Sequence, residues 1–94
     1  MRPVTLTDLS AAARVLLALP EDRRAAALGA LLARAECADR HRHATGQAHP
    51  AYGNGTLLAA ALAHPGADPA GPGDRAYLSC LAQVLEALLH ANSV

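Results

Sequence analysis

One long run, from Pro20 to Gly46, limits what this chain can fold into more than any other feature. The run is dominated by Ala, Leu and Arg, which favour helix, and it contains no proline after its first residue. Proline suits the first helical turn, where its missing N–H needs no partner, and glycine suits the residue after the last turn. Glu21 and Asp22 match the positive end of the helix dipole. The run therefore predicts one long helix over residues 20–45.

The rest of the chain predicts three further helices. Hydrophobic residues make up 52% of the chain, nearly all of them Ala, Leu and Val, and the aromatic and β-branched residues that strands favour are scarce. Thr7, Thr56 and Asp74 can each cap the start of a helix, and Pro20 and Pro65 mark stops. The sequence predicts an all-α fold with a single domain over residues 1–94, a small bundle of four helices at approximately 7–19, 20–45, 56–64 and 74–91, the second long and the third short.

Charge and cysteine content exclude several classes of protein. The formal net charge is zero and the pI is about 7.0, so no overall field attracts nucleic acid or membranes. The polar start of the chain does not resemble a signal peptide, and no apolar run approaches the ~20 residues that cross a bilayer. Cys37 and Cys80 are expected to be reduced, which fits a cytoplasmic protein.

The long helix is predicted to be apolar on two sides. The first side carries Leu28, Leu31, Leu32 and Ala35. The second side carries small residues at the spacings of a coiled-coil seam: Ala26, Ala30, Ala33 and Cys37. A helix that is apolar on two sides must be covered on both. Either the first and last helices cover both sides within the chain, or one side is an interface for a partner or for a second copy in a homo-oligomer.

Polar residues follow on the same helix: Asp39, Arg40, Arg42 and His43. Asp39 can pair with Arg42 three residues on or with His43 four residues on. The segment is interpreted as the solvated end of an overhanging helix, with a polar contact patch for a partner as the alternative. The last helix has a wide apolar face that consists of Tyr77, Leu78, Leu81, Val84, Leu85, Leu88 and Leu89.

The remaining polar motifs carry weak chemical signals. Cys37 and His41 share a helical face and could bind zinc, but no second close ligand pair accompanies them, so we expect no metal site. The same residues lack an acidic orienter and an oxyanion element, so no catalytic residue is assigned. The turn formed by Gly53, Asn54, Gly55 and Thr56 is interpreted as a helix-capping turn, with anion binding as the alternative. No cofactor is expected.

Several short motifs resemble a group of short alphaproteobacterial proteins. They are Ala38-Asp39-Arg40, Ala44-Thr45-Gly46, His49-Pro50, Tyr52-Gly53-Asn54-Gly55-Thr56-Leu57 and Ala59-Ala60-Ala61-Leu62. The group is identified as one that includes the small terminase subunit of gene transfer agents, which are phage-like particles that package host DNA. The resemblance implies an oligomeric, non-enzymatic subunit that brings DNA to the large terminase. The chain departs from phage small terminases in having no N-terminal helix-turn-helix and no basic excess, which implies weak, nonspecific DNA contact.

These observations favour a non-enzymatic assembly or adaptor subunit, and a small-terminase-like DNA-packaging factor is the most specific form of that hypothesis. The alternative is a small cytoplasmic regulatory protein that binds one protein partner.

Overall fold

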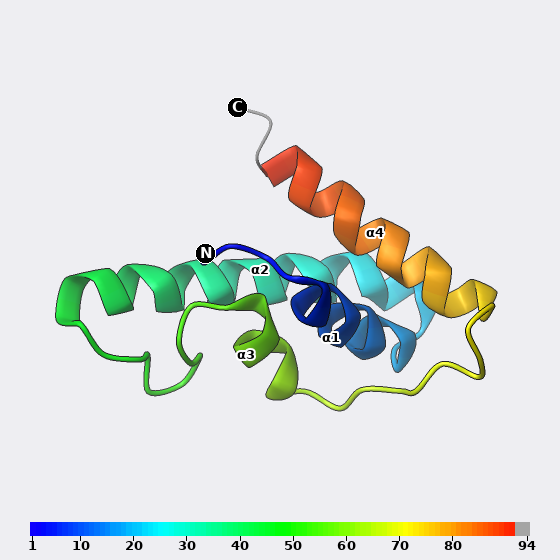
Figure 1. Cartoon of the computed structure of the whole chain (residues 1–94), viewed down its shortest axis with the longest axis horizontal. Helices are drawn as coiled ribbons and strands as arrows, with labels where there is room; N and C mark the ends of the chain where they lie inside the picture. The colour runs from blue at the N-terminus through cyan, green and yellow to red at the C-terminus, as the bar shows by residue number, and fades with distance from the viewer. Residues whose placement is uncertain (92–94) are drawn as a thin grey trace.

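The structure, a computed structural model, describes residues 1–91, and every regular element in this part of the chain is a helix (Figure 1). The all-α class, the order of the elements, the long second helix and the short third helix are confirmed. The helices are α1 (Leu6–Leu17), α2 (Glu21–Thr45), α3 (Leu57–Leu62) and α4 (Arg75–Ala91).

Helix α1 begins at Leu6, one residue before the predicted start at residue 7, because the cap is Thr5 and not Thr7. The Thr5 hydroxyl accepts a hydrogen bond from the Asp8 amide at 3.3 Å, and the Asp8 carboxylate accepts one from the Thr5 amide at 2.8 Å. This reciprocal pair is a capping box, which satisfies two amide groups that helical hydrogen bonds leave free. Thr7 instead lies exposed in the first turn.

The connection between α1 and α2 is short and fixed by an arginine. Nε of Arg24, in the first turns of α2, donates to the carbonyl oxygens of Leu16 at 2.9 Å and of Leu19 at 3.2 Å. Carbonyl groups at a helix C-terminus have no partner within the helix, so a cation there is favourable. Pro20 was predicted in the first turn of this helix, but it is the N-cap residue, one position before the first helical residue Glu21.

Helix α2 is the longest element, and its leucine side faces the core. Its 25 residues extend about 37 Å at 1.5 Å per residue, most of the 42 Å length of the molecule. Leu28, Leu31 and Ala35 are buried, whereas Ala26 and Ala33 on the second apolar side are exposed. The sequence did not decide which of the two apolar sides of this helix faces the core; in the structure it is the leucine side.

Helix α1 lies at the centre and packs against the other three helices. The hydroxyl of Tyr77 on α4 donates to the Ser10 side chain on α1 at 3.0 Å and joins these two helices. One cluster of buried side chains draws on all four helices: Ala12, Ala13, Val15, Leu16, Leu28, Leu31, Ala35, Leu57, Ala60, Ala61, Cys80, Val84 and Leu88.

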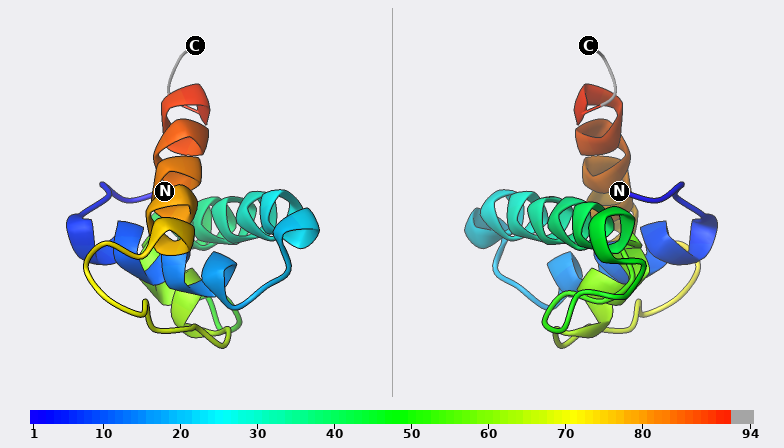
Figure 2. Two further views of the ribbon diagram at one scale, coloured as in Figure 1. Left: turned by 90° about the vertical axis from the view of Figure 1, so that its right-hand side faces the viewer. Right: turned by 90° about the vertical axis from the view of Figure 1, so that its left-hand side faces the viewer.

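Helix α4 crosses the body of the molecule, and its C-terminal half rises away from the other helices (Figures 1 and 2). Only one side of its apolar face is buried, at Cys80, Val84 and Leu88. Within residues 1–91, no helix combines the length and the hydropathy that crossing a membrane requires.

Candidate functional site

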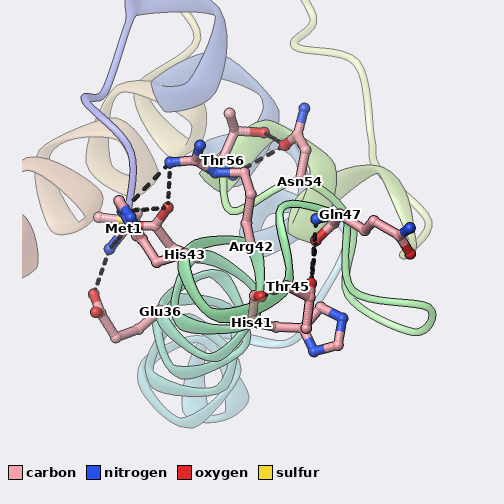
Figure 3. Close-up of polar contacts among 10 residues, drawn as sticks. Met1, Glu36, His41, Arg42, His43, Thr45, Gln47, Asn54 and Thr56 are labelled. Carbon is pink, nitrogen blue, oxygen red and sulfur yellow. Dashed lines mark hydrogen bonds and ion pairs between the residues drawn. The ribbon is translucent and has the colours of Figure 1, made fainter.

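The polar residues near the end of α2 lie where the chain's N-terminus returns to this helix (Figure 3). The Asp39 side chain accepts a hydrogen bond from Nη2 of Arg42 at 3.0 Å and lies 3.7 Å from Nε2 of His43. Its second carboxylate oxygen is 3.1 Å from the amino group of Met1, which also pairs with Glu36. The predicted pairing of Asp39 with Arg42 and His43 is confirmed.

The interpretation of this segment as a solvated, overhanging helix end is wrong for Asp39, which is only 9% exposed. The loop over residues 46–56 approaches it so closely that a Cβ on Gly55 would lie 2.8 Å from the Cα of Asp39. The Arg2 amide donates to the Gly55 carbonyl at 3.0 Å and brings the N-terminal segment to the same place. Arg40 and His43 stay exposed, so the patch retains a polar surface without Asp39.

The groups around Asp39 shift the pKa values of its carboxylate and of the Met1 amino group in the directions that favour the charged forms. The hydrogen bond from Arg42 lowers the pKa of Asp39 below its usual range, burial opposes this, and the hydrogen bond and charge of the Met1 amino group add to the lowering. Burial lowers the pKa of the Met1 amino group, but hydrogen bonds and attraction from Glu36 and Asp39 outweigh it and raise that pKa overall. Both groups are therefore held in their charged forms. Nε of Arg42 is buried and has no acceptor among the residues that the structure describes.

The turn formed by residues 53–56 caps α3, as predicted. The Thr56 hydroxyl accepts from the Ala59 amide at 3.1 Å, and the Asn54 side chain accepts from the Thr56 amide at 3.1 Å. Gly53 and Gly55 have positive φ angles of 88° and 92°, which side chains disfavour. The turn therefore has a structural role: its internal hydrogen bonds order the loop and cap the first turn of α3.

Asp8 occupies the place that a bound anion would take at the start of α3. Its second carboxylate oxygen accepts from the Leu58 amide at 2.8 Å, while the Ala59 amide already has Thr56 as its partner. This arrangement contradicts the alternative that the turn presents these amides to a phosphate. The sequence showed Asp8 in a first helical turn, but no pattern connects it to an amide fifty positions later.

His41, which the sequence paired with Cys37 as a possible zinc ligand, makes a ring contact with the loop after α2. His41 and His49 meet edge to face with centroids 5.0 Å apart, and His49 stacks on Tyr52 at 4.6 Å. The Arg34 guanidinium lies 5.8 Å from the Tyr52 ring centroid, and its Nη1 is 2.6 Å from Nε2 of His64. Within residues 1–91, the structure places no group of three or more His, Cys, Asp or Glu side chains where they could hold a metal ion. These contacts attach the loop over residues 46–56 to α2.

The small-residue side of α2 is only partly covered by its own chain. Ala26 and Ala33 are exposed, and Ala30 and Cys37 are half-buried. Ala30 lines an apolar groove of about 370 Å³ between α2, the end of α1 and the segment after α3. Cys37 and Cys80 are both free thiols, and burial raises the pKa of Cys80.

Besides the groove, exposed leucines on α4 form a second apolar surface. The sequence analysis predicted these leucines as part of one wide apolar face of the last helix. Leu78, Leu85 and Leu89 are 46%, 43% and 72% exposed. With exposed Ala82 they repeat at intervals of four, three and four, and Leu62 on α3 is a further exposed leucine at 72%. Sequence periodicity identified these leucines as apolar but could not show which of them α1 would leave uncovered.

Comparison with known proteins gives a family and no function. A family described as a domain of unknown function (DUF7742) matches residues 2–88, nearly the whole chain. The chain belongs to this family. Searches of curated proteins and of solved structures gave no match. The DUF7742 match covers all of α1, α2 and α3, and α4 as far as Leu88. Asp39 with its partners Arg42 and His43, the groove beside Ala30 and most of the exposed leucines therefore lie inside the family region.

Proposed function

We propose that this chain is a non-enzymatic assembly subunit, in its most specific form a small-terminase-like DNA-packaging factor of a phage-like gene transfer agent. In this role it forms a homo-oligomer in the cytoplasm and recruits DNA to the large terminase. The resemblance in the motifs of residues 38–62 motivates the specific form of the proposal.

The exposed leucine stripe on α4, formed by Leu78, Leu85 and Leu89, carries the general form of the proposal. Apolar patches of this kind on a small domain mark interaction surfaces, because their burial against a partner is favourable. Intervals of four and three residues are those at which side chains of one helix pack into a second helix. The C-terminal half of α4 projects from the body of the molecule (Figure 2), and Leu85 and Leu89 on this half are exposed.

The DNA-recruiting part of the proposal depends on weak electrostatics. The formal net charge is zero, and Arg40, His43 and half-buried Arg42 are the basic residues clustered near the end of α2. A few phosphate contacts of this kind give binding that is insensitive to sequence and falls steeply with salt. Recruitment would then depend on many copies acting together in an oligomer.

Mass measured in solution by light scattering or native mass spectrometry tests the proposal. A ring of eight or more copies is expected for a packaging factor, whereas a clean monomer over the accessible concentration range would contradict it. A gel shift with mixed-sequence DNA at low and at moderate salt is the second measurement. We expect a weak shift that disappears as salt rises, and Arg40→Gln should weaken it.

A second candidate function is a regulatory protein that binds one protein partner. The groove beside Ala30 favours it, because a concave apolar surface with an arginine in its lining suits the recognition of one partner segment. A monomer in solution that binds one copy of a partner would support this function and remove the packaging role.

A further inference from the structure

The groove beside Ala30 combines apolar walls with a single arginine. The end of α1, the middle of α2 and the segment after α3 line its volume of about 370 Å³. The apolar lining includes Val15, Leu19, Ala27, Ala30 and Leu31. This volume lies within the range of about 300–1,000 Å³ that ligand pockets span. It suits one large apolar side chain and part of a neighbour.

The arginine in the lining has no acidic partner among residues 1–91. Salt bridges in this part of the chain pair Arg14 with Asp68 and Arg42 with Asp39, but no carboxylate lies within 4 Å of Arg34. Arg34 is half-buried, so its charge is only partly solvated. A partly desolvated guanidinium next to apolar walls favours an occupant that brings a carboxylate.

Two neighbours hold Arg34 in place. Arginine has only donors, so Nε2 of His64, 2.6 Å from Nη1, is the acceptor in this hydrogen bond. The ring of Tyr52 lies beneath the guanidinium with its centroid 5.8 Å away. An arginine that is already oriented loses less conformational freedom on binding, and its other N–H groups remain for a carboxylate.

We propose that this groove binds an acidic segment of a partner protein, with an apolar side chain inside the groove and a neighbouring carboxylate on Arg34. The inference rests on the proposed function, because the partner of an assembly or adaptor subunit is a protein. The apolar lining selects a leucine-like side chain, and the Arg34 charge selects glutamate or aspartate beside it. Basic segments are rejected by the same charge.

Titration of the isotope-labelled full chain with three blocked peptides tests this, with NMR amide shifts as the readout. The peptides share two central leucines flanked by glutamates, by glutamines or by lysines. The glutamate peptide should give saturable shifts centred on Ala30, Leu31 and Arg34 and bind about fivefold more tightly than the glutamine peptide, the effect of one partly exposed ion pair. The lysine peptide should bind more weakly than both.

Two variants separate the contributions of charge and shape. Arg34→Gln should abolish the preference for glutamate over glutamine while some binding of the leucines remains. Ala30→Leu fills the groove and should abolish binding of all three peptides. Ala33→Leu is the matched control, because it makes the same change on an exposed position of the same helix and should leave binding unchanged. Circular dichroism melting of each variant establishes that it is folded.

The proposal is overturned if the glutamate peptide gives no saturable shifts, if the lysine peptide binds equally well, or if Ala33→Leu weakens binding as much as Ala30→Leu. The solution mass of the same sample keeps this result separate from the proposed function. A large ring that does not bind the glutamate peptide removes the groove proposal alone. A monomer that binds the peptides in the expected order removes the packaging role and leaves the groove proposal standing.

Discussion

Asp8 joins the starts of two helices that are distant in sequence. Its carboxylate receives hydrogen bonds from the amide and hydroxyl of Thr5 and from the amide of Leu58. The side chain is buried, with only 4% of the residue exposed. Burial raises the pKa of Asp8, but the hydrogen bonds from Thr5 and Leu58 outweigh it and lower the pKa overall. The charged carboxylate therefore stabilises the folded state.

We expect Asp8→Asn to lower the free energy of unfolding by about 2 kcal/mol at pH 7, the range for hydrogen bonds to a charged group. Because the folded-state pKa is lowered, this stability is present above the ordinary pKa of about 3.9 and is lost as the pH falls through the folded value. Urea unfolding at several pH values should show the difference between wild type and variant shrinking below pH ~4.

Asp68 gives a control for this prediction. Its pairing with Arg14 is at the surface, with 85% of the Asp68 side chain exposed. Asp68→Asn should change stability little at any pH. A pH-independent loss in Asp8→Asn would show that the loss of one acceptor oxygen, and not the missing charge, is responsible.

Gly55 is required by its backbone angle and by its distance from Asp39. It has φ +92°, and a Cβ there would meet the Cα of Asp39 at 2.8 Å. Gly55→Ala is expected to cost about 3 kcal/mol of unfolding free energy, since conformational strain and a backbone clash act together. Urea denaturation measures it directly.

Two other glycines separate these two effects. Gly46 has φ +74° with open space around it, so Gly46→Ala should cost only about 1 kcal/mol. Gly71 has neither a positive φ nor a close neighbour, and Gly71→Ala should be neutral. Equal losses at positions 55 and 46 would mean that the close approach to Asp39 contributes nothing.

At the scale of whole helices, local signals were enough to predict most of the fold. Pro20 and Gly46 mark the ends of α2, and Thr56 marks the start of α3, because each acts on the backbone of its own neighbourhood. The start of α1 was predicted late because Thr5 and Thr7 are both residue types that cap helices, and only the reciprocal hydrogen bonds between Thr5 and Asp8 distinguish them.

Burial of each helix face could not be predicted in the same way. Periodicity shows that α2 is apolar on two sides and that α4 has one wide apolar face, but the packing partner decides which part of these surfaces is covered. Asp39 is covered because the N-terminal segment and the loop over residues 46–56 return to it, and Asp8 reaches Leu58 across the α1–α3 contact. The candidate groove likewise joins three segments, so sequence analysis identified Ala30 as a contact residue but missed Arg34.

At the scale of the whole molecule, the uncovered apolar surfaces decide how copies assemble. All four helices already share one core, so Leu85 and Leu89 gain burial only from a neighbour. Burial of a leucine against a neighbour contributes about 1–2 kcal/mol, and the contribution grows with the share of the side chain that is exposed before assembly. Replacing both with glutamine should leave the fold intact and raise the concentration needed for assembly at least about tenfold.

Leu62→Gln is the matched control, because Leu62 is as exposed as Leu89 but lies on α3. Light scattering over a dilution series should show full assembly for this variant and dissociation for the Leu85→Gln, Leu89→Gln pair. If instead the α4 pair assembles like the wild type while Leu62→Gln dissociates, the interface lies on the α1–α3 side, since Leu6 and Leu62 line one shallow depression there.

If both variants assemble fully, the exposed alanines of α2 are the remaining surface, and Ala26→Glu with Ala33→Glu should then break the assembly.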